Sequence, residues 1–470
     1  MLGLLGSGVA AGEWFVLLRH ELVLFAASFF LIGALDEIAV DLTYLWLRLT
    51  GRARTPRVDE TALVGAPLRG RCAVFIPAWR EDRVIGATLA HALRVWPQDH
   101  IRFYVGCYPN DPDTIAAIEQ AADTDCRLRP VVHEFDGPTS KPDCLNRLYR
   151  ALVEDEAREG FAAQMVVLHD AEDMVDQAAL PLLDRALEHV EFAQLPVIAL
   201  PQRHSRWIAG HYTDEFAEAH ARTMVVRSTL GTGIPGAGVG CAIAREWLAK
   251  LDRKRAGAGP FAAGSLTEDY ELGLELAAMG ARSQFVRVRA AGGRLIATRA
   301  YFPSELKAAV RQKARWVHGI AFQGWDRLGW RGTPVALWMM LRDRRGPLAA
   351  LLLAMAYLLV VVAALEYALA AIGLVANAPL SPTLVTLLWL NFAALIWRVV
   401  ARSLFTAREF GWIEGVLAVP RTVVSNTIAI IAGRRALVGY IRTLRGAPPV
   451  WDKTEHSDHP LLAPVAAKAR

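Results

Sequence analysis

The sequence has few charged residues and no paired cysteines. Charged residues make up 21% of its 470 residues, a low share for a soluble chain. None of its five cysteines belongs to a C-x-x-C pair or has a histidine at zinc-like spacing, which excludes the common structural zinc sites. The thiols are therefore expected to be reduced and inert, as in a cytosolic catalytic portion.

The sequence also lacks the motifs typical of nucleic-acid-binding proteins and of dinucleotide-binding folds. The middle of the chain has no basic stripe with interleaved aromatic residues, which excludes a protein that binds nucleic acid. The glycine-rich segment 231–240 lacks G-x-G-x-x-G spacing and an early first-strand position, which excludes a dinucleotide-binding fold. Its glycines are expected instead to leave backbone room for a bulky donor or acceptor.

Apolar residues are in excess. Hydrophobic residues make up 53% of the chain, and the mean hydropathy is +0.25. The net charge is +5, and arginines gather beside apolar runs, at 48–57 and 342–345. Because this is the positive-inside pattern, we predict a multi-pass membrane protein whose catalytic portion lies in the cytosol.

The apolar runs divide the chain into segments. Residues 1–50 are predicted to hold one spanning helix, at 15–38, with an interfacial extension; because no basic start precedes this run and no A-x-A-like site follows it, a cleaved signal peptide is not expected. A linker rich in Arg, Pro and Gly follows at 51–71. An interfacial connection at 331–347 leads to a predicted transmembrane hairpin at 348–402, built from the runs 348–365 and 379–397. A C-terminal tail is expected at 447–470.

The segment 403–446 is more polar than the predicted spans. Its apolar run, 412–431, contains Glu414, Pro420 and Arg421, and further arginines follow. A full span would carry those arginines to the outer side, against the positive-inside bias. We therefore expect interfacial or re-entrant helices here.

Residues 72–330 alternate short apolar runs with helical patterns, which predicts an α/β domain with a mostly parallel sheet. Strands are expected at 73–77, 101–105 and 165–168. The last of these ends at His169-Asp170, so this carboxylate is expected at the carboxyl end of a strand, where α/β sheets bind ligands.

The acidic motif Asp170-Ala171-Glu172-Asp173 follows that strand. Two carboxylates at i and i+2 suit Mg²⁺ or Mn²⁺ bridging a diphosphate, and because such a cation keeps several waters, few protein ligands suffice. The alternative is a solvated acidic turn.

Two further motifs lie at predicted helix starts. Thr267-Glu268-Asp269 is either a capping acidic turn or the place of a general base that takes the proton of an acceptor hydroxyl. Lys141, which follows a Gly-Pro turn, is either a phosphate contact or a surface lysine.

The motif Gln312-Lys313-Ala314-Arg315-Trp316 precedes the second apolar run. An arginine and a tryptophan on one helix turn are often ordinary packing with a solvated charge. Beside a membrane, a short cationic and aromatic patch of this kind suggests chemistry at the bilayer surface.

In order and spacing, these motifs resemble those of family 2 glycosyltransferases over roughly residues 70–330. The segments that carry the resemblance are Ile76-Pro77-Ala78-Trp79-Arg80-Glu81, 141–146, 170–173, Pro201-Gln202, 267–269 and 312–316. The flanking architecture is similar to the phage-adsorption protein B group of bacterial inner-membrane glycosyltransferases, and more distantly to cellulose synthase. The resemblance implies a GT-A type fold at 72–330 with flanking transmembrane helices, a nucleotide-sugar donor, a Mg²⁺ or Mn²⁺ cofactor and inversion at the anomeric carbon.

The resemblance also implies residue roles. Asp170 and Glu172 would bind the metal and diphosphate, with Asp173 an alternative ligand, and Asp269 would be the catalytic base. Lys141 and Arg315 would bind the donor, and Asp111 would lie at the uracil site, although many relatives have paired aspartates there. Residues implied to bind the acceptor are Glu268, Gln312 and Trp316. Glu172 stands where Asp is usual, and Pro142-Asp143 where Ala-Gly is common.

Three functions are compatible with these features. The first is a membrane-bound hexosyltransferase of the bacterial inner membrane that uses a UDP-sugar to build a surface glycan. Its few spans leave no room for a wide pore, so an outer-membrane export partner is expected. Some relatives carry a further nucleotide-sensing domain, for which the sequence up to Arg470 is expected to leave no room. The second is a single-sugar transferase onto a lipid acceptor. The third is a catalytically silent receptor or scaffold among the membrane lipids.

Overall fold

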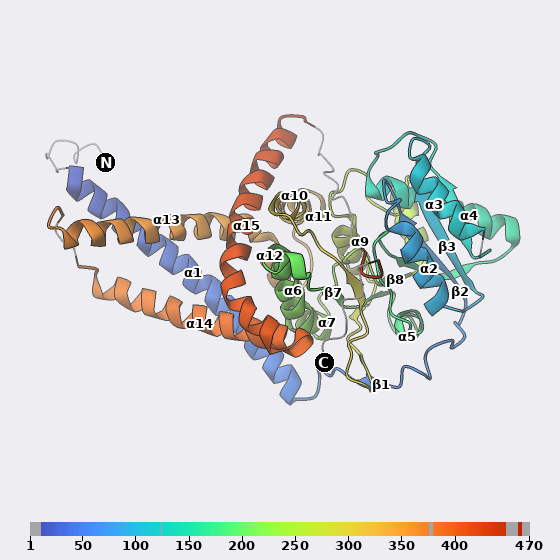
Figure 1. Ribbon diagram of the computed structural model, residues 1–470, viewed down its shortest axis with the longest axis horizontal. Coiled ribbons are helices and arrows are strands. Elements are labelled where there is room, and N and C mark those ends of the chain that lie inside the picture. Colours follow the sequence, from blue (N-terminus) through green and yellow to red (C-terminus); the bar gives the residue numbers. More distant parts are fainter. Residues whose placement is uncertain (1–10, 124, 376–378, 448–458, 463–470) are drawn as a thin grey trace.

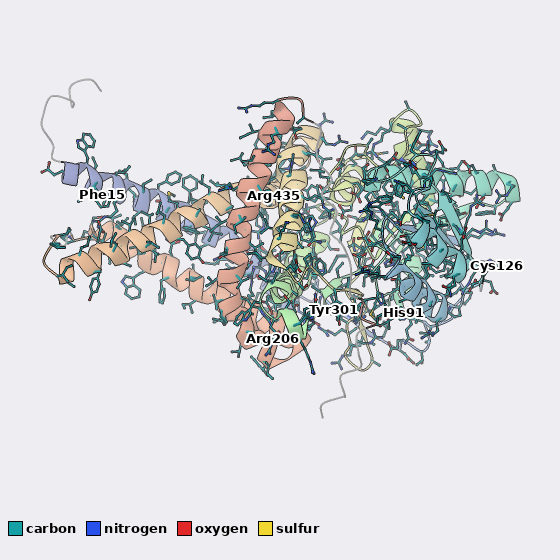
Figure 2. All side chains as sticks on the ribbon, turned by 45° about the horizontal axis from the view of Figure 1, so that its top comes forward. Phe15, His91, Cys126, Arg206, Tyr301 and Arg435 are labelled. Atoms are coloured by element: carbon teal, nitrogen blue, oxygen red, sulfur yellow. The ribbon has the colours of Figure 1, made fainter. Side chains whose placement is uncertain are left out.

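The computed structural model describes residues 11–123, 125–375, 379–447 and 459–462. Figure 1 shows a sheet domain on one side and a bundle of long helices on the other. The helices α1 (Ala11–Leu49), α13 (Gly346–Ala371) and α14 (Pro382–Phe410) extend away from the sheet. In Figure 2, Phe15 of α1 lies at the far end of this bundle and Cys126 at the opposite side of the molecule.

The central sheet has seven strands in the order β4-β3-β2-β5-β8-β6-β9. Neighbouring strands are parallel, except that β8 runs antiparallel to both β5 and β6. The strands are β2 (Arg71–Pro77), β3 (Ile101–Cys107), β4 (Leu128–Val132), β5 (Ala163–Leu168), β6 (Phe192–Gln194), β8 (Cys241–Ala244) and β9 (Ser283–Phe285). Two small parallel pairs join β1 (Arg57–Val58) to β10 (Arg289–Ala290) and β7 (Val197–Ala199) to β11 (Thr298–Ala300). The predicted α/β class with a mostly parallel sheet is confirmed.

Both faces of the sheet are buried, because alternate strand residues point to opposite sides. Val74 of β2 lies in the core on one side, with α2 (Ile85–Val95), α3 (Pro112–Ala122) and α5 (Ala179–Ala186). Phe75 lies in the core on the other side, with α4 (Lys141–Glu159), α8 (Arg245–Lys254) and α9 (Glu268–Ala278). Apolar side chains on both faces explain why these strands have continuous apolar sequences.

A group of shorter helices lies between the sheet and the bundle. They are η1 (Arg203–Ser205), α6 (Ile208–Glu218), the π-helical turn η2 (Ala219–Thr223), α7 (Met224–Thr229), α10 (Leu306–Val317), the π-helical turn η3 (His318–Gln323), α11 (Gly324–Leu328) and α12 (Pro334–Arg344). The helix α15 (Trp412–Leu444) packs against α6 and α10 of this group and against α13 and α14 of the bundle.

Partly buried ion pairs join α1 to this group. Glu37 of α1 lies 2.7 Å from a nitrogen of Arg222 and 2.8 Å from one of Arg342. Arg345 also pairs with Glu37 and with Asp36. Removing one partner of such a set leaves an uncompensated buried charge, so the pairs fix how α1 meets the sheet domain.

In the described part of the chain, four helices are long and apolar enough to cross a membrane: Glu13–Leu49, Gly346–Ala371, Pro382–Phe410 and Trp412–Leu444. The first three overlap the runs predicted to span, which supports membrane association. The fourth contains the run predicted to be interfacial. Figures 1 and 2, the latter with Arg435 labelled on α15, show this helix lying across the direction of the other three. Its interfacial placement stays a prediction, and most of the expected tail at 447–470 lies outside the described residues.

The glycine-rich loop at 231–240 packs directly on α9. The Gly236 N–H donates to the carbonyl oxygen of Asp269 over 3.1 Å. A Cβ on Gly236 would lie 2.6 Å from that oxygen, and one on Gly238 2.8 Å from Asp269 Oδ2. These two glycines therefore leave room for the protein's own helix, and the expected room for a donor or acceptor stays a prediction.

We predict that Gly273→Ala destabilises the protein by about 1–3 kcal/mol. A Cβ there would lie 2.2 Å from the Ile234 carbonyl oxygen, a backbone atom that cannot rotate away. Thermal unfolding of the purified protein in detergent measures the effect. Gly86→Ala is the matched control, because Gly86 is also helical and its Cβ would meet nothing within 4 Å. Equal unfolding midpoints for the two variants would contradict the close approach of loop and helix.

Candidate active site

The predicted site residues gather mainly at one edge of the sheet. Asp111 follows β3 and Asp170 follows β5, while Lys141 begins α4 and Glu268 begins α9. Since the carboxyl ends of parallel strands lie at the same edge, the sheet brings these chain segments together.

Lys141 is the centre of the site. Its Nζ lies 2.5 Å from Asp170 Oδ1 and 3.6 Å from Glu268 Oε1. The position is fixed because Ser140 caps α4, its Oγ accepting the Asp143 N–H. Burial lowers the pKa of Lys141, but Asp170, Glu268 and Asp269 outweigh it and raise the pKa above the ordinary value. The ammonium therefore stays charged among three carboxylates.

Glu268 and Asp269 are adjacent acids at the start of α9. Burial raises the pKa of Glu268, Lys141 opposes the rise, and Asp269 adds to it, which gives a value of about 7. Burial also raises the pKa of Asp269, against the charges of Lys141 and Arg315. Asp269 Oδ1 accepts the Tyr270 N–H over 2.8 Å, so the carboxylate is held in place. A carboxylate with a raised pKa is a stronger base than an exposed aspartate.

The acidic turn after β5 separates its three carboxylates. Asp173 is buried, and its Oδ2 accepts both the Asp170 N–H over 3.0 Å and a hydrogen bond from His169 Nδ1 over 2.8 Å. Burial raises its pKa, while His169 opposes the rise. Asp170 and Glu172 are both partly exposed. The turn is thus held from inside by Asp173, which leaves Asp170 and Glu172 at its surface.

The exposed pair fits a hard divalent cation shared with a diphosphate. Mg²⁺ and Mn²⁺ need one or two carboxylates when phosphate oxygens and waters complete the set. Within the described ranges, no group of three or more His, Cys, Asp or Glu side chains is placed to hold a metal without such a ligand.

Asp111 lies farther along the same edge, since β2 separates β3 from β5. It is buried, and its Oδ2 accepts the Arg80 N–H over 2.6 Å. Beside it, the rings of Trp79 and Tyr108 meet edge to face with centroids 5.2 Å apart. The structure thus places Asp111 in a small aromatic and polar corner, one strand away from β5 and Asp170.

The three predicted site residues on α10, Gln312, Arg315 and Trp316, do not share one environment. The charge of Arg315 acts on Asp269, and within the described residues its Nε makes no hydrogen bond. Gln312 is buried, and its Oε1 is likewise unpaired there. Trp316 packs with Tyr212 and Phe216 of α6, at ring distances of 6.1 and 6.4 Å. Its indole therefore belongs to the packing of α10 on α6 and α15, while Arg315 belongs to the acidic cluster.

The turn η3 positions the acidic residues and was missed by sequence reasoning. Gln323 Oε1 accepts the Leu266 N–H over 3.0 Å, and its Nε2 donates to the Gly264 carbonyl oxygen over 3.2 Å. A Cβ on Gly319 would lie 2.4 Å from Thr267 Oγ1. Sequence spacing gives no signal for these contacts, because they depend on how a π-helical turn meets α9.

Comparison with protein-family models matches residues 70–319 to "Glycosyltransferase like family 2". The chain is 32% identical, over 469 aligned positions, to the bacteriophage adsorption protein B of Escherichia coli strain K12 and to the bacteriophage N4 adsorption protein B of E. coli O157:H7. Each alignment covers 94% of this chain and 62% of the relative, so the chain spans less than two thirds of their length.

Two solved structures are more distantly similar. A mannosyltransferase from Pyrobaculum calidifontis, in complex with GDP-mannose and Mn²⁺, is 16% identical with a TM-score of 0.49, over 87% of this chain and 99% of its own. A glucosyl-3-phosphoglycerate synthase from Mycobacterium tuberculosis, in complex with Mn²⁺, UDP and phosphoglyceric acid, is 18% identical with a TM-score of 0.37, over 60% and 86%.

The family match covers more than half of the chain and includes every predicted site residue, from Asp111 to Trp316. The chain therefore belongs to glycosyltransferase family 2.

Proposed function

We propose that this protein is an inverting, metal-dependent hexosyltransferase that moves a sugar from a UDP-sugar to a glycan acceptor during surface polysaccharide synthesis. The observation that carries the proposal is the cluster of Lys141 with Asp170, Glu268 and Asp269 at the carboxyl edge of the sheet. In this cluster, Lys141 is a cation that can bind phosphate, Asp170 is a carboxylate that can bind a metal ion, and Asp269 is a base with a raised pKa. Glycosyl transfer from a nucleotide-sugar needs groups of these three kinds.

In this mechanism, Asp269 takes the proton of an acceptor hydroxyl as the oxygen attacks the anomeric carbon. The attack comes from the face opposite the diphosphate, so a single displacement inverts the configuration. Lys141 and Arg315 stabilise the charge that develops on the departing diphosphate. Asp170 and Glu172 would hold a Mg²⁺ or Mn²⁺ ion, with Asp173 as the alternative ligand, and the ion adds positive charge at the same place. Asp111 would contact the uracil.

The acceptor is proposed to lie near the membrane face, beside Glu268, Gln312 and Trp316. Trp316 packs in the cluster that contains Ile428 of α15, so this side of the site borders the helix that crosses the bundle. The same contact favours a second candidate, transfer of one sugar to a lipid acceptor. A silent receptor is disfavoured, because gathering three carboxylates in a partly buried site costs free energy without benefit to a scaffold.

The cellular setting is a proposal as well. The long apolar helices and the arginines at 342–345 favour the bacterial inner membrane with the sheet domain in the cytosol. The two relatives are named for bacteriophage adsorption, which supports a role at the cell surface. An outer-membrane partner for export is part of this proposal, because the candidate spans are too few for a wide pore.

We expect Asp269→Asn to lower sugar transfer by about 10²–10⁴-fold, because an amide cannot accept the acceptor proton. UDP release from a panel of UDP-sugars with Mn²⁺ measures the effect and also identifies the donor. Glu246→Gln is the control, since the Glu246 side chain is 70% exposed on α8. If Asp269→Asn releases UDP as fast as the unaltered protein in the presence of acceptor, Asp269 is not the base.

We also expect kcat/KM to fall as the pH drops through about 7. The pKa of Glu268 is raised to about 7, so below that pH it takes up a proton and can no longer accept a hydrogen bond as a carboxylate from the acceptor. Glu268→Gln removes a negative neighbour of Asp269 and should move the inflection to lower pH. A pH profile of kcat/KM for both proteins measures this, and an inflection unchanged by Glu268→Gln would rule out Glu268 as its source.

A further inference from the structure

A short segment near the C-terminus, 459–462, is docked on the sheet domain through its first residue, His459. Figure 1 draws it in dark red close to the labels of α9 and β8, away from the upper end of α15. The His459 side chain is 1% exposed. Such burial of a polar ring requires hydrogen-bond partners, and the imidazole has one on each side, Leu461 of its own segment and Thr88 of α2.

The hydrogen bonds of His459 run in one direction. The Leu461 N–H donates to Nδ1 over 3.2 Å, so Nδ1 is an acceptor and the proton of the neutral ring lies on Nε2. Nε2 is 3.2 Å from Thr88 Oγ1 and donates to it. Thr88 Oγ1 in turn donates to the Ala171 carbonyl oxygen over 2.6 Å. The relay therefore ends in the turn that carries Asp170 and Glu172.

Thr88 has a second acceptor within reach. Its Oγ1 is 3.3 Å from the Val84 carbonyl oxygen of the preceding helical turn, a bond that many helical threonines make. The Thr88 hydroxyl has one hydrogen, so it can donate fully to only one of the two carbonyl oxygens. When another group donates a hydrogen bond to the hydroxyl oxygen, the bond that the hydroxyl itself donates becomes stronger. His459 thus favours the longer-range bond to Ala171, which ties α2 to the acidic turn.

The surroundings keep the ring in this form. Thr88 and Ala171 are both buried, so water does not compete for the relay. Burial and, to a lesser extent, the neighbouring His91 together lower the pKa of His459 to about 4. His91 itself bonds the Val175 carbonyl oxygen over 2.9 Å, just beyond the same turn.

We propose that His459 is a positioning residue for the donor site: the docked segment 459–462 fixes, through Thr88, the turn whose Asp170 and Glu172 would hold the cation and diphosphate. This rests on the proposed function. It makes a stretch of chain that follows the four candidate membrane spans of the described residues part of the site at the ends of β3 and β5.

The test compares Mn²⁺ binding with amide exchange in the full chain. His459→Ala and Thr88→Val each remove one link of the relay, and His459→Gln keeps an N–H donor. With UDP present, the Mn²⁺ dissociation constant, measured by the electron paramagnetic resonance of free Mn²⁺, should rise about three- to tenfold in the first two variants and return toward the original value in His459→Gln. The double variant should be no weaker than either single one, because both break the same chain of bonds.

Hydrogen exchange followed by mass spectrometry provides the readout that needs no metal. Peptides covering 169–174 should exchange faster in His459→Ala than in the unaltered chain. Leu462→Ala is the control for the segment itself, since Leu462 is 60% exposed, and it should leave both measurements unchanged.

The outcomes separate the two proposals. If the unaltered chain binds Mn²⁺ with UDP but His459→Ala binds it equally well, the positioning role is wrong and the proposed function stands. If the unaltered chain binds neither Mn²⁺ nor UDP, the positioning role and the proposed function both fail. Unchanged exchange at 169–174 in His459→Ala, or additive losses in the double variant, would also overturn the relay.

Discussion

The site depends on the attraction between the ammonium of Lys141 and the carboxylates around it. Three carboxylates, those of Asp170, Glu268 and Asp269, approach one another where β5, α4 and α9 meet. Without a cation between them, such a group would neutralise itself by binding protons or would push the helix starts apart. One buried ammonium, 2.5 Å from Asp170, lets the chain keep the acids together in a partly desolvated place.

The same constraint explains how the surrounding elements are held. The loop at 231–240 can approach Asp269 because its glycines have no Cβ, and Gln323 of η3 holds the backbone just before Glu268. Behind them, Tyr270 OH donates to Asp343 of α12 over 3.0 Å, and Arg227 binds the same carboxylate. Asp343 is two residues from Arg345, which pairs with Glu37 of α1. These polar contacts, joined by the short stretch of chain from Asp343 to Arg345, therefore link the start of α9 to α1.

Local patterns were enough to predict the α/β class, the strands β2, β3 and β5, and the places of Asp170 and Lys141 in the fold. Asp170 could be placed because a strand that ends in a carboxylate has a defined position at the sheet edge, and Lys141 because a helix start is a defined anion-facing position. Gln323, Gly319 and His459 could not, since each acts through a contact between segments far apart in the sequence. For Trp316, sequence spacing also does not reveal the ring contacts with Tyr212 and Phe216 that the structure shows, and its role in sugar stacking stays a prediction.

The most direct test of the central claim is UDP binding by isothermal titration calorimetry in the presence of Mn²⁺, comparing the unaltered chain with Lys141→Met. If Lys141 is both the diphosphate contact and the charge that holds the acidic cluster, UDP affinity should fall at least about tenfold in the variant, as expected for loss of a charge-assisted hydrogen bond. Equal affinity for UDP in the two proteins would contradict the account.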